Sequence, residues 1–162
     1  MENMISQAEN IAPCSRELLD RIREFETALA QMPGTIAGDG PVRHFFGDGL
    51  YIREYTGSKG TLAVSKLHKT NHPYFVMTGD CSVITNEGPI RIRAPHFGIT
   101  KAGTKRILYF HEDTIWITVH ATEETDLEKI EDQVIAKTYH ELPDDVKLTL
   151  GIETEAQLCH GK

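Results

Sequence analysis

The chain has 162 residues, a net charge of −7 and 40% hydrophobic residues, which is enough for one domain with its own core. The acidic balance argues against a broad nucleic-acid or anionic-membrane surface, because such surfaces need basic patches. No segment approaches the ~20 apolar residues of a membrane span. The cysteines, Cys14, Cys81 and Cys159, form no Cys-x-x-Cys pair, so we expect a reducing, cytoplasmic compartment.

The first predicted element is a helix over residues 15–33. Residues 1–14 show no periodicity and have neither a basic start nor an apolar run, so we expect a flexible N-terminus without a signal peptide. Ser15 is a good N-cap, and Pro33-Gly34 ends the pattern. The apolar stripe consists of Leu18, Ile22, Phe25, Leu29 and Met32. The helix is too short to be stable alone, so it packs either on its own domain or against the same helix of another subunit.

Short β-patterned segments separated by glycine-containing breaks fill residues 42–122. The predicted strands are 44–46, 50–56, 61–68, 73–78, 81–85, 89–94, 97–100, 105–110 and 114–121. Many short strands at close spacing indicate a sandwich or barrel, and there is no room for helical crossovers.

The pattern becomes helical again over residues 123–150. Thr125 and Glu128 form a capping box, and the first helix is expected to run to about Lys137. Leu142-Pro143-Asp144-Asp145 can start a last short helix. The tail, 151–162, is polar and expected to be mobile.

Strand alternation predicts which side chains face the interior. The groups that share a face are Leu62, Val64, Lys66 and His68; His72, Tyr74, Val76 and Thr78; Thr104, Arg106, Leu108 and Phe110; and Thr114, Trp116, Thr118 and His120. These faces mix large apolar residues with a few polar heads, as the wall of a ligand-holding barrel does. The alternative is an outer face whose cations project into water.

Residues 44–121 resemble a cupin, a small double-stranded β-helix or jelly-roll barrel. Residues 75–79 (Phe-Val-Met-Thr-Gly) are similar to the aromatic-apolar run that follows the metal-binding glutamate in the first cupin motif. Aligning on this run places His72 at the glutamate, His68 at the second histidine and Lys66 at the first. The resemblance implies a mainly β fold with a single cupin-type barrel, and the predicted N- and C-terminal helices flank it.

The second cupin motif is present in altered form. Gly103 matches its glycine, Lys101 takes the place of its proline, and Arg106 stands where a histidine ligand is expected. A cupin metal centre uses about three histidines and one carboxylate, which would leave His68, His72 and His120 as ligands for Zn, Fe, Mn or Ni. Lys66 and Arg106 cannot bind a metal while charged, and they raise the cost of holding one nearby.

The chain also resembles a group of uncharacterised phage-encoded cupin-like proteins. The similar segments are Val42-Arg43-His44-Phe45, 66–72, 102–106, His111 to Trp116 and Thr125-Asp126-Leu127-Glu128. This resemblance implies a viral origin and action in an infected bacterial cell, and it brings no known reaction.

Two shielded cations in a barrel need an anionic partner to offset their desolvation. Lys66 and Arg106 suit a nucleotide, sugar phosphate or carboxylate, with Tyr74 and Trp116 as a stacking wall and His68, His72 and His120 nearby. The alternative is a neighbouring Asp or Glu that neutralises the cations.

Three functions follow from these features. The first is a binding module that holds a small anionic molecule without turnover, in one version sequestering a host signalling nucleotide. The second is a phage structural or assembly protein, and the third is a metal-dependent oxygenase, isomerase or lyase. We expect a homo-oligomer in each case, without nucleic-acid or membrane partners.

Overall fold

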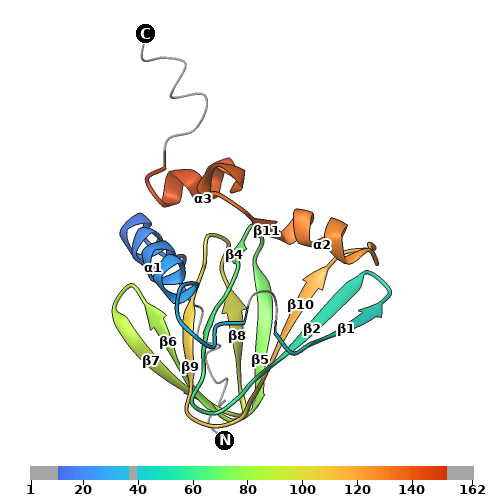
Figure 1. Cartoon of the computed structure of the whole chain (residues 1–162). Helices are drawn as coiled ribbons and strands as arrows, with labels where there is room; N and C mark the ends of the chain where they lie inside the picture. Colours follow the sequence, from blue (N-terminus) through green and yellow to red (C-terminus); the bar gives the residue numbers. More distant parts are fainter. Residues whose placement is uncertain (1–10, 37–39, 153–162) are drawn as a thin grey trace, which may run out of the picture.

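The computed structural model describes residues 11–36 and 40–152. Two antiparallel sheets face each other, and the helices gather around one end of the resulting barrel (Figure 1). The first sheet has the strand order β1-β2-β10-β5-β8, and the second has the order β3-β9-β6-β7. The mainly β prediction is therefore confirmed.

The strands and helices follow the predicted segments closely. The first sheet contains β1 (Val42–Gly47), β2 (Leu50–Gly57), β5 (His72–Thr78), β8 (His96–Thr100) and β10 (Thr114–Ala121). The second contains β3 (Leu62–Val64), β6 (Asp80–Thr85), β7 (Gly88–Arg93) and β9 (Ile107–Phe110). The remaining elements are α1 (Arg16–Leu29), β4 (Leu67–His68), α2 (Leu127–Val134), β11 (Ile135–Ala136), the 3-10 turn Tyr139–Glu141 and α3 (Asp144–Thr149).

The strand order is that of a jelly roll. Apart from β1 and the short pair β4–β11, the first barrel strand pairs with the last (β2 with β10) and the second with the second-last (β3 with β9). The inner pairs are β5 with β8 and β6 with β7. This nesting is what results when one long hairpin is rolled into two facing sheets. The predicted jelly-roll barrel is therefore present.

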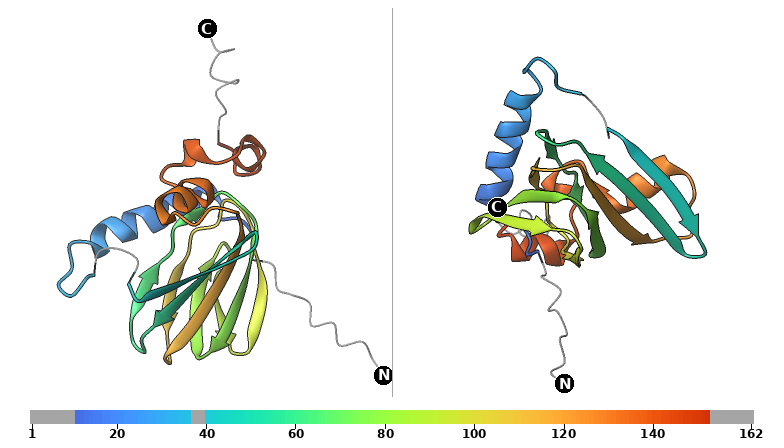
Figure 2. Two further views of the ribbon diagram at one scale, coloured as in Figure 1. Left: turned by 90° about the vertical axis from the view of Figure 1, so that its right-hand side faces the viewer. Right: turned by 90° about the horizontal axis from the view of Figure 1, so that it is seen from below.

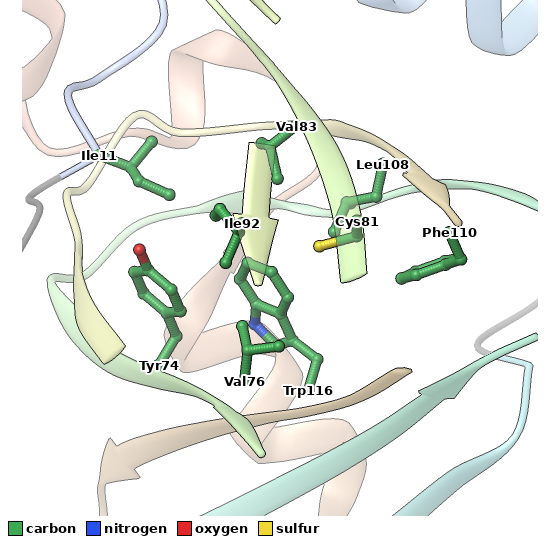
Figure 3. Packing of buried hydrophobic residues seen from close by; sticks show 9 residues of the cluster. All are labelled: Ile11, Tyr74, Val76, Cys81, Val83, Ile92, Leu108, Phe110 and Trp116. Carbon is green, nitrogen blue, oxygen red and sulfur yellow. The ribbon is translucent and has the colours of Figure 1, made fainter. Parts of the chain in front are cut away.

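The middle of the barrel is filled with apolar side chains from both sheets (Figure 3). The buried cluster contains Ile11, Tyr74, Val76, Cys81, Val83, Ile92, Leu108, Phe110 and Trp116. The alternation predicted for 104–110 and 114–120 is correct, since Thr104, Arg106, Thr114 and His120 are also buried.

Helix α1 packs on its own domain. The Ser15 side chain accepts a hydrogen bond from the Leu18 amide, as predicted for an N-cap. Leu19 and Ile22 are buried in a second cluster with Leu67 of β4 and Leu150 after α3. Of the two placements left open for this helix, the structure has the one within the domain.

Three local predictions are wrong. Asp126, not Thr125, caps α2, because its carboxylate reaches the amides of Glu128 and Lys129. The chain leaves the helix at Ile135, whose extended backbone lets β11 pair with β4. Residue Thr78 is exposed at the end of β5 rather than inside the barrel.

The predicted strand 61–68 is broken into β3 and β4, which changes the faces of its residues. The break lies at Ser65, whose amide donates to the Arg106 carbonyl and whose hydroxyl accepts from the Arg106 amide. Leu62 and Val64 therefore point outward, and Ala63 packs on the interior cluster. Only past the break, at His68, does the predicted inward face return.

The chain ends are partly packed. Ile11 donates its amide to the Ile99 carbonyl and accepts from the Lys101 amide, so this residue extends the β8 edge. Cys14 and Ile152 are buried with α1. The expected flexible N-terminus is thus ordered over 11–14. The tail, expected to be mobile over 151–162, begins with a buried Ile152 whose amide donates to the Lys147 carbonyl. Residues 1–10 and 153–162 lie outside the described residues. Within the described residues, no helix has both the length and the apolarity needed to cross a membrane.

Candidate functional site

Three histidines meet at the helix-covered end of the barrel. The register of β10 on β5 sets Thr118 opposite Tyr74, so His120 and His72, each two residues further along, lie side by side on the inner face. The short link from β4 to β5 brings in His68. The ring centroid of His72 lies 4.3 Å from that of His68 and 4.4 Å from that of His120. The ring centroids of His68 and His120 are 6.0 Å apart.

All three imidazoles are neutral near pH 7. Burial lowers the pKa of His72 to about 3, and the neighbouring His120 adds to the effect. Burial, followed by the charge of Arg53, lowers the pKa of His120 to about 4. The pKa of His68 is held well below its usual value, chiefly by burial and then by His72 and His120. His72 Nδ1–H donates to the Thr70 carbonyl, 3.2 Å away. Since the ring is neutral, its other nitrogen, Nε2, carries a lone pair.

Two imidazole nitrogens in this cluster have no hydrogen-bond partner in the described structure. They are Nδ1 of His68 and Nδ1 of His120, and both are shielded from solvent. The other nitrogen of His120, Nε2, lies 3.2 Å from the Thr118 hydroxyl. An unsatisfied buried polar group costs roughly 1–3 kcal/mol. A bound molecule with suitable oxygens would remove that cost.

Arg106 is the buried cation of the site, at 5% exposure. Its guanidinium donates to the Thr100 hydroxyl and lies over two aromatic rings, with Cζ 5.2 Å from the Tyr74 centroid and 5.5 Å from the Trp116 centroid. Burial lowers its pKa to about 10, so the group stays charged at neutral pH. Its charge also helps to lower the pKa values of His68 and His72. No carboxylate in residues 11–36 and 40–152 pairs with it.

A glycine turn holds Arg106 beside the histidines. Gly103 has φ of +83°, and a Cβ there would lie 2.9 Å from Val146 Cγ1, so glycine is required. Its amide donates to the His68 carbonyl at 2.8 Å, and the His68 amide donates to the Thr104 carbonyl at 3.1 Å. These bonds attach β4 to the segment that leads into Arg106. The glycine of the second cupin-like motif therefore has a positioning role.

Lys66 does not join Arg106. Its Nζ lies 2.8 Å from Glu131 Oε1 on α2, and its side chain is 36% exposed. The residue sits at the rim, where the break at Ser65 has turned it away from the interior face. Of the two predicted cations, Lys66 is thus neutralised by a carboxylate, as the alternative interpretation expected. Arg106 has no such partner among the described residues.

The other predicted site residues come together. Tyr74 and Trp116 stack with centroids 4.8 Å apart and planes at 11°, and the Tyr74 hydroxyl lies 3.0 Å from His96 Nε2. Both rings form the boundary between the apolar middle of the barrel and the polar end. The predicted stacking wall is therefore occupied by the Arg106 guanidinium.

Three contributors were missed in the sequence. Arg53 on β2 lies opposite Thr118 and lowers the pKa values of His68 and His120. The Tyr51 ring stacks on His120 at 5.9 Å, and Thr100 bonds Arg106. The alternation Tyr51-Ile52-Arg53 was the available signal, since it places Tyr51 and Arg53 on one face.

Helix α2 and strand β11 cover this end of the barrel (Figure 1). Ile130 and Val134 of α2 pack on Tyr51, and Ile135 pairs with His68. The Lys66–Glu131 ion pair joins the rim to the same helix. A molecule that enters from the helix-covered end would therefore have to pass α2 and β11.

The histidine cluster fits a metal ion poorly as it stands. Neutral imidazoles and the two unpartnered Nδ1 atoms are suitable ligands. However, no group of three or more His, Cys, Asp or Glu side chains among the described residues is arranged to hold an ion. Arg106 acts on two of the three rings and opposes a second cation. The metal at His68, His72 and His120 remains a prediction.

Comparison with known proteins gives partial structural matches. No family model matches the chain, and no curated protein matches its sequence. Among solved structures, a cupin-2 domain containing protein from Shewanella frigidimarina is similar with a TM-score of 0.43 and 10% identity, over 60% of this chain and 91% of that one. The cupin domain of an XRE family transcriptional regulator from Enterobacter cloacae gives a TM-score of 0.44 and 8% identity, over 54% and 100%.

An acetylacetone dioxygenase from Acinetobacter johnsonii gives a TM-score of 0.42 and 16% identity, over 49% of this chain and 58% of that one. At these scores the overlap is too loose to carry an argument, and the jelly-roll assignment rests on the strand order of the chain itself. The matched structures include an enzyme and a domain of a transcriptional regulator, so the matches do not favour one function over another. A phage origin rests on the sequence resemblance alone.

Proposed function

We propose that this barrel binds a small anionic molecule at its polar end, with Arg106 as the anchoring cation. The observation that carries the proposal is a buried guanidinium that no described carboxylate neutralises. A charge in such a place is costly unless it is paired. A carboxylate or phosphate group supplies the missing charge and accepts the remaining guanidinium hydrogens.

The histidines act as neutral hydrogen-bond donors in this proposal. The Nδ1 atoms of His68 and His120 have no partner in the described structure, and in the tautomer protonated at Nδ1 each would donate to an anion oxygen. His72 lies between them and is fixed by Thr70. Charge from Arg106 and hydrogen bonds from neutral rings together favour an anion over a neutral or cationic molecule.

The apolar cluster restricts the ligand to the polar end. Tyr74, Val76 and Trp116 belong to the filled middle of the barrel, so the anionic head enters beneath α2 and the rest of the molecule remains near the rim. A small carboxylate or a sugar phosphate fits this description most simply. The resemblance to phage-encoded proteins motivates a host signalling nucleotide as a specific version, with its phosphate at Arg106.

Isothermal titration calorimetry with three probes tests the proposal. Malonate, glucose 6-phosphate and a cyclic nucleotide represent the three ligand classes, and native mass spectrometry of freshly purified protein looks for a retained metabolite. We expect at least one class to bind, and Arg106→Met to weaken that binding at least tenfold. The matched control is Arg93→Met, because Arg93 is an exposed arginine paired with Asp80 on the outside of the barrel.

Equal binding by wild type and Arg106→Met, or no binding and no retained anion, would defeat the proposal. Turnover of a bound probe that stops on chelation would support the metal-dependent enzyme instead. Recovery of the protein only as part of a virion, with no small-molecule binding, would support the assembly function.

A further inference from the structure

The outer face of the five-stranded sheet is almost entirely apolar. In an antiparallel sheet with one wet face, outward positions are normally polar. Here β10 reads Ile115-Trp116-Ile117-Thr118-Val119, so its outward side chains are as apolar as those facing the interior. A strand that is apolar on both sides indicates a sheet that is covered on both sides.

The neighbouring strands continue this surface, as their register shows. Phe45 of β1 pairs with Ile52 of β2, which pairs with Val119 of β10. In the next row, Ile117 pairs with Phe75 of β5 and Phe75 with Phe97 of β8. We call the set Phe45, Ile52, Phe75, Met77, Phe97, Ile99, Ile115, Ile117 and Val119 the outer apolar face.

This face is exposed in the described chain. Phe45 is 45%, Phe75 36%, Met77 55% and Phe97 51% exposed, and the helices lie at the end of the barrel rather than in front of these strands (Figure 2, left). At roughly 200 Å² for a whole aromatic side chain, each of these leaves on the order of 100 Å² in water. With the half-buried isoleucines and valine, the face exposes several hundred Å², which is of the same order as the ~800 Å² per partner of a standard interface.

The face carries no net charge. Its outward charged residues are Arg43 and Glu54, and they pair with each other, Arg43 Nη2 lying 2.6 Å from Glu54 Oε1. A second copy of the same surface is therefore not repelled, which is a requirement of a two-fold interface where one patch meets itself. Two twisted sheets also pack well face to face at a small angle.

We propose that the outer apolar face is the interface between two copies of this chain, packed sheet on sheet. The end segments of the chain are poor alternatives, because residues 1–10 and 153–162 contain only Met1, Met4, Ile5 and Leu158 as large apolar residues. The proposal replaces the α1 stripe as the expected source of self-association, since α1 is used within the domain. It does not depend on the anion site, which lies on the opposite side of the same sheet.

Sedimentation velocity of the full chain from about 1 to 100 µM tests the interface. We expect a dimer of the 18.2 kDa chain, and a dissociation constant at least thirtyfold weaker for Phe97→Glu. The control is Leu62→Glu, which puts the same charge at a similarly exposed apolar residue, 45% against 51% for Phe97, on the other sheet. This control should stay dimeric.

A measurement on the wild type keeps the test valid if Phe97→Glu fails to fold. Carbene footprinting at low and high protein concentration should show protection of Phe45, Met77 and Phe97 only at the high concentration. The proposal is overturned if the wild type sediments as a monomer over the whole concentration range. That holds even if footprinting shows the outer apolar face to be protected, because something other than a second copy would then cover it. A dimer that survives Phe97→Glu, or that Leu62→Glu dissociates equally, also overturns it.

Discussion

The guanidinium of Arg106 lies over the indole of Trp116, with Cζ 5.5 Å from the ring centroid. The same guanidinium lies over Tyr74, so the cation is held by two π faces and the Thr100 hydroxyl. Such contacts contribute about 0.5–2 kcal/mol each, less than the penalty of burying an unpaired charge. We therefore expect Arg106 to lower the stability of the protein without a bound anion and to stabilise the anion complex.

Replacing Arg106 should separate stability from binding. We expect Arg106→Met to leave the free energy of unfolding within about 1 kcal/mol of wild type or to raise it, because a long apolar side chain fills the site without desolvating a charge. Urea denaturation without added anion measures this. A loss of more than about 3 kcal/mol would mean that Arg106 is a structural residue satisfied within the chain.

Lys66 should matter little to either property. Its ion pair with Glu131 joins two partly exposed side chains, and such pairs contribute about 0–1 kcal/mol. We expect Lys66→Met to change both the stability and the affinity for the best anion far less than Arg106→Met changes affinity. Calorimetry of the two variants side by side checks this, and an equal loss of affinity would return Lys66 to the binding site.

The histidine cluster should make the fold sensitive to acid. The pKa values of His72 and His120, about 3 and about 4 in the folded chain, lie below the ordinary 6.5. At a pH between the folded pKa values and 6.5, these histidines are protonated in the unfolded chain but neutral in the folded chain. The free energy of unfolding therefore falls as pH falls below about 6.5. At pH 5 the loss is about 2 kcal/mol for each histidine relative to pH 8.

Urea denaturation at pH 8 and pH 5, with a chelator present, measures this loss. The double variant His72→Gln with His120→Gln should lose most of the pH dependence, whereas His140→Gln, at an exposed histidine, should keep it. Equal pH dependence in all three proteins would show that other groups are responsible.

Gly103 should be intolerant of a side chain. Gly103→Ala combines a φ of +83° with a Cβ 2.9 Å from Val146, and we expect a loss of about 2–3 kcal/mol together with weaker anion binding, because the turn positions Arg106. The matched control is Gly60→Ala, where φ is +78° with no atom within 4 Å of the Cβ. It should lose only about 1 kcal/mol, and equal losses would rule out the steric contact with Val146.

The barrel could be predicted from the sequence because its signals are local. Glycine-bounded alternation located most strands to within a few residues, and Ser15 marked the start of α1. The inward set Thr104, Arg106, Leu108 and Phe110 followed from the two-residue period of a strand. The same reasoning failed at 61–68, because the break at Ser65 is made by hydrogen bonds to Arg106, a residue far away in sequence.

The candidate site was predicted in part for the same reason. His68, His72, His120, Tyr74, Trp116 and Arg106 were chosen one strand at a time, and the structure brings them together. The neutrality of the histidines, the pairing of Lys66 with α2 and the involvement of Arg53 depend on which strands are neighbours. No window of the sequence contains that information.

By itself, the sequence determined the class of fold and the inward face of the segments 104–110 and 114–120, since both follow from the backbone's own periodicity. The tertiary structure alone decided that Arg106 has no described carboxylate partner and that one sheet presents an apolar face to water. Burial and pairing are properties of neighbours in space, and the jelly roll assigns as neighbours strands that lie at opposite ends of the chain.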